Sequence, residues 1–417
     1  MDAAREFDFV VFGASGFTGK YVTKEVQVVC EQEGLKWAIA GRSKSKLNEV
    51  LGSIQNKQSN MPEIIIADVN DYQSLIMMCK RCTVVLDCVG PYRFFGEQVV
   101  KACVEAKSHF VDISGEPQYL ETMQFKYDKD AKENGVYVVG ACGFDSIPSD
   151  LGVVYAQQKF KGTLNGIKSF LKISSPYGFV GHYGTFASAV HGLGDVKNLI
   201  KLRKSSNHSP LPLVGPKLKL ERFGHYNRNM GSYTIPFLGS DNSVVKRSQR
   251  YLYENQSQPA VQYSMYSCIS GLWYLFLLAV FGGIFKFLAL RPWGRTLLLN
   301  NPKFFSAGYF SHEGPTEKQM EETSFSLTMY GEGYSDGQTT TGRTDKPDKK
   351  IVVRVSGPEP GYVATPILMV QAAVVLLKEK ENLPPSGGVL PPGAAFAKTS
   401  LISRLSKRGM KFEVLAP

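Results

Sequence analysis

A short apolar run followed by three closely spaced glycines places the strongest constraint on how this chain can fold. Residues 9–12 read FVVF, and Gly13, Gly16 and Gly19 follow directly. In such a turn the first glycine can adopt a positive φ, the second lets the backbone approach a ligand, and the third allows tight packing of a helix on the strand. Apolar residues at helical spacing continue after the turn, so the sequence predicts a strand, a tight turn and a helix.

The predicted turn is suited to a phosphate, because a helix N-terminus presents unpaired amide hydrogens and the positive end of the helix dipole. The first two glycines are separated by two residues, whereas many dinucleotide sites have one residue there. We therefore predict a pyrophosphate site and keep an ordinary structural turn as the alternative. The residues expected to line the site are Gly13, Ala14, Ser15, Gly16, Phe17, Thr18 and Gly19.

The end of the second predicted strand indicates which dinucleotide binds. The apolar run 37–40 is followed by Gly41, Arg42 and Ser43. NAD-preferring folds usually place an acid here for the ribose hydroxyls, whereas a guanidinium can bind a 2′-phosphate through two hydrogen bonds. Arg42, with Ser43 beside it, favours NADP over NAD as the cofactor. An exposed arginine at a helix start is the alternative interpretation.

Further apolar runs alternate with helix-like segments and complete the pattern of one sheet. They span residues 64–67, 84–89, 110–113 and 136–139. This alternation predicts an α/β fold with a parallel, doubly wound Rossmann sheet, whose ligand lies beyond the carboxyl ends of the strands. At that edge we expect Asp68 to bond the adenine, with a helix cap as its alternative role. Gly90 and Pro91 would lie beneath the nicotinamide ribose.

Hydride transfer needs a positioned nicotinamide, a dry pocket and one proton donor, so a dense catalytic motif is not expected. Tyr92, Asp145 and Ser146 are the catalytic candidates, because they follow predicted strands at the same sheet edge. A helix cap is the alternative role of Asp145, and a hydrogen bond to the backbone is that of Ser146. Cys79 and Cys82 have metal-ligand spacing but lack a second pair, so no metal site is predicted.

Five strings together match one protein family. They read GASGFTG at 13–19, AGR at 40–42, CVGPY at 88–92, DISGE at 112–116 and GFDSIPSDLG at 143–152. The chain resembles the saccharopine dehydrogenase-like oxidoreductase family over nearly its full length. The resemblance implies an NAD(P)-binding Rossmann domain followed by a second α/β domain. The chain is similar, more distantly, to fungal saccharopine reductases and mycobacterial trans-acting enoyl reductases. The substrates of these relatives differ widely, so the resemblance implies a class of reaction but no particular substrate.

The length of 417 residues, of which 43% are hydrophobic, allows two substantial cores. We predict a Rossmann NAD(P)-binding domain at 1–150, a second α+β domain at 151–365, and a C-terminal helix and return at 366–417. In the second domain a helix is expected at 187–202 and an antiparallel strand pair at 324–330 and 351–355. Thr365 is expected to cap the helix that begins with Pro366.

Residues 261–285 contain no charged side chain, which is unusual for a water-soluble dehydrogenase. The most apolar part, 272–285, would form a helix about 21 Å long, shorter than a hydrocarbon core of about 30 Å. Lys286, Arg291 and Arg295 follow it. We predict that the segment 261–290 inserts into one leaflet of a membrane or into a lipid-droplet monolayer. A buried core helix or a homodimer contact is the alternative.

The net charge of +11 points to an anionic partner, and basic residues cluster at 197–204, 217–228 and 246–250. This suits an anionic membrane surface or ligand. No nucleic-acid-binding module accompanies the charge, so we expect no nucleic-acid partner. Seven cysteines without a preceding secretory signal predict reduced thiols and an intracellular protein. We expect it on lipid droplets or membranes, with the mitochondrion as the alternative.

Two functions remain open at this point. The first is an NAD(P)-dependent oxidoreductase, with NADP favoured, that acts on a small-molecule or lipid-linked substrate in lipid or glycolipid metabolism. The second is a noncatalytic protein in which the Rossmann domain binds nucleotide or only supports docking on a membrane.

Overall fold

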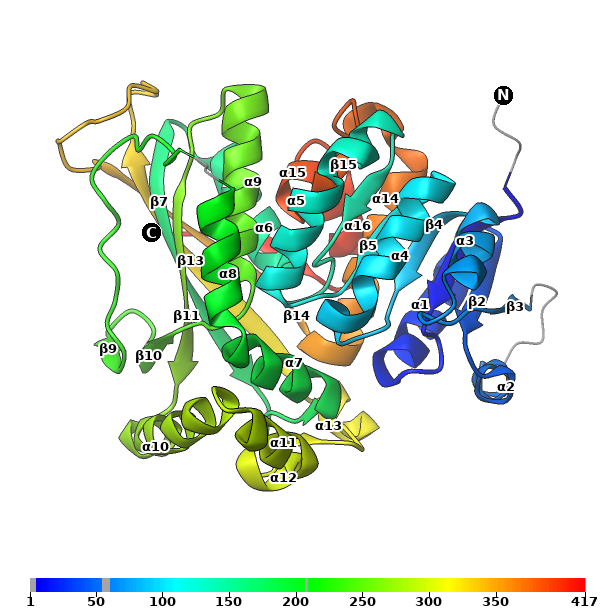
Figure 1. Ribbon diagram of the computed structural model, residues 1–417. Helices are drawn as coiled ribbons and strands as arrows, with labels where there is room; N and C mark the ends of the chain where they lie inside the picture. Colours follow the sequence, from blue (N-terminus) through cyan, green and yellow to red (C-terminus); the bar gives the residue numbers. More distant parts are fainter. Residues whose placement is uncertain (1–4, 55–60, 207–208, 417) are drawn as a thin grey trace. The chain divides into compact units, whose positions relative to one another are not determined.

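The computed structural model describes residues 5–54, 61–206 and 209–416, which form two compact units (Figure 1). Unit 1 comprises the chain up to Ser114, Tyr119–Ile147 and Gly361–Arg408, and unit 2 comprises Gly115–Gln118, Pro148–Pro360 and the chain from Gly409. The main boundaries between the units follow Ile147 and Pro360, whereas the sequence predicts them at 150 and 365. Residues 366–408 belong to unit 1, whereas the chain after Arg408 belongs to unit 2.

Unit 1 is built on a parallel sheet with the strand order β15-β6-β5-β4-β1-β2-β3. Its strands are β1 (Phe7–Phe12), β2 (Trp37–Gly41), β3 (Glu63–Ile66), β4 (Cys82–Asp87), β5 (His109–Asp112), β6 (Tyr137–Val139) and β15 (Gly388–Leu390). The central strands are almost fully buried because helices cover both faces of the sheet (Figure 1). The strand order reverses between β1 and β4, where ligands of doubly wound sheets bind. The predicted Rossmann fold is confirmed.

Helices alternate with these strands. They are α1 (Phe17–Glu33), α2 (Lys44–Ser53), α3 (Tyr72–Lys80), α4 (Tyr92–Ala106) and α5 (Pro117–Glu133), joined by α14 (Thr365–Lys378), η2 (Lys380–Asn382), α15 (Pro392–Phe396) and α16 (Leu401–Lys407). The late helix α14 packs on α1, β4 and β5, so it is buried on nearly all sides. Ion pairs tie the C-terminal part to α1, with Lys378 bonded to Glu33 and Arg408 to Glu25.

The start of α14 differs from the prediction. A π-helix, η1 (Pro360–Ala364), runs directly into α14, and Ala364 precedes its first residue. The prediction that Thr365 caps the helix is therefore wrong, although Pro366 does lie in the first turn. The Thr365 hydroxyl instead accepts a hydrogen bond of 3.0 Å from the Phe144 amide in the same unit.

Unit 2 is built on a sheet with the order β16-β14-β13-β7-β11-β10-β9, in which only β7 and β11 pair in parallel. Its strands are β7 (Thr163–Ser174), β9 (His225–Asn227), β10 (Ser232–Pro236), β11 (Gln262–Ile269), β13 (Ser324–Tyr334), β14 (Lys349–Pro358) and β16 (Lys411–Leu415). The predicted antiparallel pair is confirmed in β13 and β14. A second, two-stranded sheet contains β8 (Gly181–His182) and β12 (Phe310–Ser311).

The helices of unit 2 include two that the sequence predicts as one. Residues 187–202 form parts of α7 and α8, which are separated at Asp195. The helices are α6 (Ile147–Lys159), α7 (Tyr183–Gly194), α8 (Val196–Ser205), α9 (Asp241–Gln256), α10 (Leu272–Ala289), α11 (Pro292–Asn300), α12 (Pro302–Phe305) and α13 (Glu317–Glu321). Buried hydrogen bonds from Ser149 to Asp241 and from Ser248 to Asp150 join α6 to α9.

The charge-free stretch 261–285 divides into two different elements. Its first half is β11, which pairs with β7 and β10 inside the sheet, so this half is not available to a membrane. Its second half opens α10, whose only buried residues are Leu288 and Ala289. The alternative of a buried core helix is therefore wrong for this segment.

Candidate cofactor-binding site

The glycine-rich turn lies at the switch point of the unit 1 sheet, directly after β1. Gly13 has a φ of +82°, and a Cβ atom there would lie 2.7 Å from Val89 Cγ2 at the end of β4. A Cβ atom at Gly19 would lie only 2.1 Å from the carbonyl oxygen of Gly13. Only glycine fits at these two positions, because a Cβ at Gly13 would collide with Val89, whereas one at Gly19 would push α1 away from the turn. The Gly13 amide donates to Ala40 O at 2.9 Å, which fixes the turn on β2.

The N-terminus of α1 opens from this turn without a side-chain cap. Gly16 is the N-cap residue, and the first turn of the helix contains no acidic residue. Amide groups in the first turn of a helix lack intrahelical acceptors, and the helix dipole adds partial positive charge there. A phosphate would supply the missing acceptor, so the turn fits the pyrophosphate of a dinucleotide. Ala14 is buried, whereas Ser15 and Thr18 are partly exposed.

The ring of Phe17 packs inside unit 1, so this residue would contribute its main chain to a ligand. Its ring meets Tyr362 edge to face, with the centroids 4.8 Å apart, and Tyr21 lies beside both rings. Tyr362 belongs to η1, far along the chain from the turn. Sequence reasoning missed this residue, because nothing in the local pattern around 362 indicates contact with the first helix.

Arg42 follows β2, the strand next to β1. Its side chain is exposed, and it has no ion pair among the residues that the structure describes. The neighbouring Ser43 has a structural role as the N-cap of α2, because its hydroxyl accepts a hydrogen bond from the Lys46 amide. The guanidinium of Arg42 is therefore available for a 2′-phosphate, while Ser43 already has a partner.

Asp68 lies in the turn after β3. Its Oδ1 accepts hydrogen bonds from the main chain and side chain of Asn70, at 2.9 and 3.2 Å. The cap of α3 is Asp71, whose carboxylate accepts from the amides of Gln73 and Ser74. The alternative that Asp68 is itself the helix cap is wrong, and its contact with adenine stays a prediction.

Gly90, Pro91 and Tyr92 form the connection from β4 into α4. Gly90 is exposed, Pro91 is the N-cap residue, and Tyr92 is the first residue of the helix. The Tyr92 ring is buried, and its hydroxyl donates to the carbonyl oxygen of Asp87 at 2.8 Å. Burial raises the pKa of Tyr92 well above its usual value, and nearby Asp87 adds to this. The role of Tyr92 as a proton donor to substrate stays a prediction.

Two buried carboxylic acids end the neighbouring strands β4 and β5. Asp87 and Asp112 face each other in the sheet register. One oxygen of Asp87 accepts from the Val89 amide at 2.9 Å, and one oxygen of Asp112 accepts from the amides of Ser114 and Ala141. Burial raises the pKa of Asp87 well above its usual value, and the Asp112 carboxylate raises it further. Sequence reasoning missed this pair, although both residues directly follow apolar runs.

Asp145 and Ser146 lie in the connection from β6 to α6. The Ser146 side chain is buried and its hydroxyl donates to the main-chain oxygen of Asp145 at 2.5 Å, which is the alternative role expected for it. Asp145 is partly exposed, and desolvation raises its pKa. The catalytic role of both residues stays a prediction.

The predicted site residues therefore follow β1, β2, β3, β4 and β6, which all end at the same edge of the sheet. Among the described residues, no group of three or more His, Cys, Asp or Glu side chains is arranged to hold a metal ion.

Comparisons with known proteins agree with this geometry. A model of the saccharopine dehydrogenase NADP binding domain matches residues 9–139. Saccharopine dehydrogenase-like oxidoreductase from Homo sapiens is 52% identical, with 99% of this chain and 98% of the relative aligned. A Caenorhabditis elegans relative named lipid droplet localized protein is 37% identical, with 98% of both chains aligned. Apo saccharopine dehydrogenase (L-Glu forming) from Saccharomyces cerevisiae has a similar fold, with a TM-score of 0.57 at 12% identity, covering 98% of this chain and 100% of that one.

Replacing Gly19 by alanine tests the close packing of α1 on the turn. The added Cβ would lie 2.1 Å from Gly13 O, so the helix must shift. We expect a loss of about 1–3 kcal/mol in the free energy of unfolding, as for other overpacked sites, together with weaker NADPH binding. Urea unfolding and fluorescence titration measure the two effects. Gly52→Ala in α2 is the matched control, because its Cβ would meet nothing within 4 Å. A Gly19→Ala variant as stable as the control would contradict this packing.

Replacing Asp87 by asparagine tests whether the buried acid keeps its proton. In the unfolded chain an aspartate ionises near pH 4, whereas the folded protein holds its proton to higher pH. The wild type should therefore lose stability as the pH rises above about 4, by at most about 1.4 kcal/mol per pH unit, and Asp87→Asn should lack this loss. Urea unfolding from pH 5 to 8 should show the variant gaining stability relative to the wild type. Asp130→Asn, at an exposed position of α5, is the control. A constant difference across this range would show that Asp87 is ionised.

Proposed function

Because this chain belongs to the saccharopine dehydrogenase-like oxidoreductase family, we propose that it is an NADP-dependent oxidoreductase that works at the surface of a membrane or lipid droplet. The uncapped N-terminus of α1 above the glycine turn is the observation that carries the redox part of the proposal. The match to an NADP-binding domain model over the same strands supports it. The proposed substrate is a small molecule or a lipid-linked compound.

Each part of the cofactor has a proposed partner in unit 1. The turn from Gly13 to Gly19 would hold the pyrophosphate, and Arg42 would bind the 2′-phosphate. Gly90 and Pro91 would support the nicotinamide ribose. When bound, NADPH supplies the hydride. Asp87 would act as a positioning residue, because its carboxyl group accepts a hydrogen bond from the Val89 amide just before this turn.

The proton that accompanies hydride transfer is assigned to Asp145 or Tyr92. Asp145 is partly exposed, and desolvation raises its pKa toward the range in which a carboxyl group can act as a general acid. Tyr92 keeps its proton at neutral pH, but its ring is buried and its hydroxyl donates to Asp87 O. We place Asp145 first because its side chain is partly exposed.

The helix α10 carries the membrane part of the proposal. Within the part of the chain that the structure describes, two helices are long and apolar enough to cross a membrane, and the second, which continues through α14, is buried in the core of unit 1. Most of α10 is exposed, including Trp273 (66%), Phe276 (57%) and Phe287 (52%). An apolar surface of this kind is unfavourable in water, and it marks a contact with lipid or protein.

Both ends of α10 are held by unit 2, which favours a helix lying in the plane of a lipid surface over one that spans a bilayer. Its N-terminal end follows β11 through Gly271, and its C-terminal residues Leu288 and Ala289 pack against Val190 of α7. With 18 residues, the helix is about 27 Å long. A lipid-droplet monolayer has no second aqueous face to reach, and the nematode relative's name supports this location.

The cationic side chain of Arg291, just after α10, also favours a helix that lies in the plane of a lipid surface. The Arg291 guanidinium lies 3.6 Å from the centre of the Phe287 ring and donates to Phe287 O. Long basic side chains at such a position can reach the headgroups while their stems stay in the apolar layer. Exposed Trp293 and Phe304 extend the apolar surface onto α11 and α12.

A second function, a noncatalytic nucleotide-binding scaffold at a membrane, is favoured by one observation. The hydroxyls of both Tyr92 and Ser146 donate to main-chain oxygens within unit 1. Incubation with deuterium-labelled NADPH and a whole-cell extract that contains both lipids and small metabolites separates the two functions. Transfer of deuterium into any product would support the oxidoreductase, and its absence at full NADPH occupancy would support the scaffold.

Replacing Arg42 by alanine tests the choice of cofactor. Hydrogen bonds to charged groups contribute about 1.5–3 kcal/mol, so we expect NADPH affinity to fall roughly 10- to 100-fold. NADH affinity should stay unchanged, since NADH has no 2′-phosphate. Calorimetry of both cofactors measures this, with Lys129→Ala on α5 as a control of equal charge. An equal loss for NADH and NADPH would contradict the assignment.

Replacing Phe276 and Phe281 by glutamate tests insertion of α10. Burying one phenyl ring contributes about 1.5–3 kcal/mol, so we expect binding to phospholipid-coated triacylglycerol droplets to weaken at least about tenfold. NADPH binding should not change. Phe125→Glu is the matched control, because that residue is at least as exposed (60%) as Phe276 (57%) and Phe281 (45%) but lies on α5. Two results together would instead identify α10 as a dimer contact. Droplet binding would be unchanged, and light scattering would show a wild-type dimer that the substitutions dissociate.

A further inference from the structure

A hairpin beside α10 carries positive charge that the proposed insertion does not use. The hairpin consists of β9 and β10, and Gly224 directly precedes β9. Gly224 has a φ of +72°, and a Cβ there would lie 3.2 Å from Leu275 Cδ2 in α10. The Gly224 amide also donates to Thr234 O at 3.0 Å. The base of the hairpin is therefore packed directly on the apolar helix.

In residues 217–228, which lead into the hairpin and form its first strand, cationic side chains alternate with exposed apolar ones. The cations in 217–228 are Lys217, Lys219, Arg222 and Arg228. Three large apolar or aromatic side chains are exposed among them: Leu220 (66%), Phe223 (56%) and Tyr226 (49%). Aromatic side chains are enriched at the level of lipid headgroups, where one end is apolar and the other is wet. This composition suits the boundary between a lipid phase and water.

The positive charge on this surface is not neutralised by the protein. Glu221 is the only acid in 217–229. Its carboxylate accepts from Asn227 and from Thr234 at 3.1 and 2.9 Å, and lies 3.8 Å from Lys168 Nζ. Within the described part of the chain, neither Arg222 nor Arg228 forms an ion pair.

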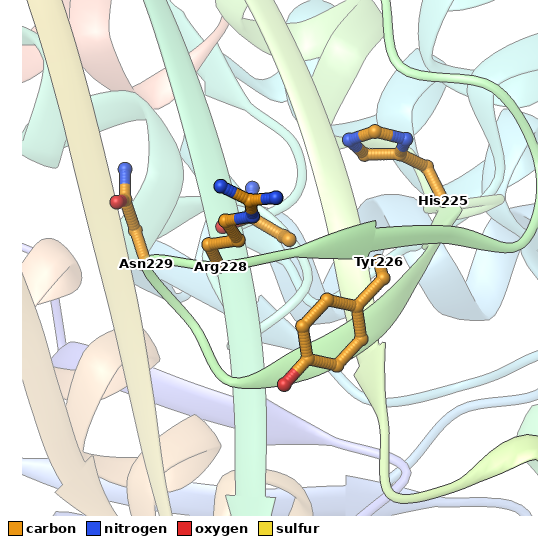
Figure 2. A pocket seen from close by; sticks show the side chains of 5 residues that line it. His225, Tyr226, Arg228 and Asn229 are labelled. Atoms are coloured by element: carbon orange, nitrogen blue, oxygen red, sulfur yellow. The ribbon is translucent and has the colours of Figure 1, made fainter.

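A shallow, open depression of about 300 Å³ lies on the surface of the hairpin. It is lined by His225, Tyr226, Asn227, Arg228 and Asn229. Figure 2 shows the side chains of His225, Arg228 and Asn229 on the same side of the backbone, with Tyr226 on the other side. These three side chains carry nitrogen donors and are exposed, so they can contact an anionic group that lies on this surface.

We propose that the β9–β10 hairpin binds the phosphate of an anionic phospholipid in the same lipid surface into which α10 inserts. The inference rests on the proposed membrane function, because contact with α10 brings the hairpin to the lipid. Arg228 is assigned to the phosphate, and Arg222 to the surrounding negative surface potential. Anionic lipid is favoured over a soluble anion because exposed Phe223 and Leu220 flank the cations.

Replacing both arginines by glutamine tests the proposal on the full-length protein. Wild type should bind triacylglycerol droplets coated with phosphatidylcholine and phosphatidylserine more tightly than droplets coated with phosphatidylcholine alone. A basic residue near an anionic surface contributes about fivefold in affinity, so Arg222→Gln/Arg228→Gln should lose roughly 10- to 30-fold on the anionic droplets. Its affinity for the neutral droplets should stay unchanged. The wild-type preference should also shrink as salt is added.

Controls separate this proposal from the insertion of α10. Lys36→Gln/Lys129→Gln removes the same charge from unit 1 and should keep the anionic preference. Phe276→Glu/Phe281→Glu should weaken binding to both kinds of droplet. An arginine variant with the wild-type preference, or a wild type with no preference, would overturn the hairpin proposal and leave insertion standing. If calorimetry showed binding of inorganic phosphate and the protein showed no preference for anionic droplets, the hairpin proposal would be overturned in favour of a soluble ligand.

Discussion

The close approach of α1 to the carbonyl oxygen of Gly13 is the contact on which the cofactor site depends. It is possible only because Gly19 has no side chain, and it brings the start of the helix to the place where the strand order reverses. An uncapped helix end at that place has both the donors and the local potential to bind a phosphate. Arg42, at the end of the adjacent strand, is the residue that we propose to distinguish the two nicotinamide dinucleotides.

The parts of the fold that local sequence determines were predictable. Apolar runs and glycine spacing predicted the first six strands and the turn after β1, because strand burial and positive φ depend on short segments. Hydrophobicity alone did not separate β11 from α10, since a buried strand and an apolar helix look alike over 261–285. The contact of Tyr362 with Phe17 and the buried pair Asp87 and Asp112 depend on neighbours from distant parts of the chain, which the local pattern does not reveal.

The two proposed activities belong to different units. The cofactor site lies in unit 1, whereas α10 and the β9–β10 hairpin belong to unit 2. Each can therefore be altered without touching the residues of the other. This separation is what allows a noncatalytic scaffold and an oxidoreductase to be distinguished by experiment, because the same protein can be measured for nucleotide binding and for lipid binding independently.

The return of the chain to unit 1 also has a consequence for biosynthesis. Strands β4 and β5 are covered by α14, and β6 gains its outer neighbour only when β15 is made. A ribosome adding about 5–20 residues per second needs roughly 10–40 s to pass from the end of the first part of unit 1 at Ile147 to Gly361. During that interval an apolar sheet face and a strand edge are without their final cover, which exposes the nascent chain to aggregation.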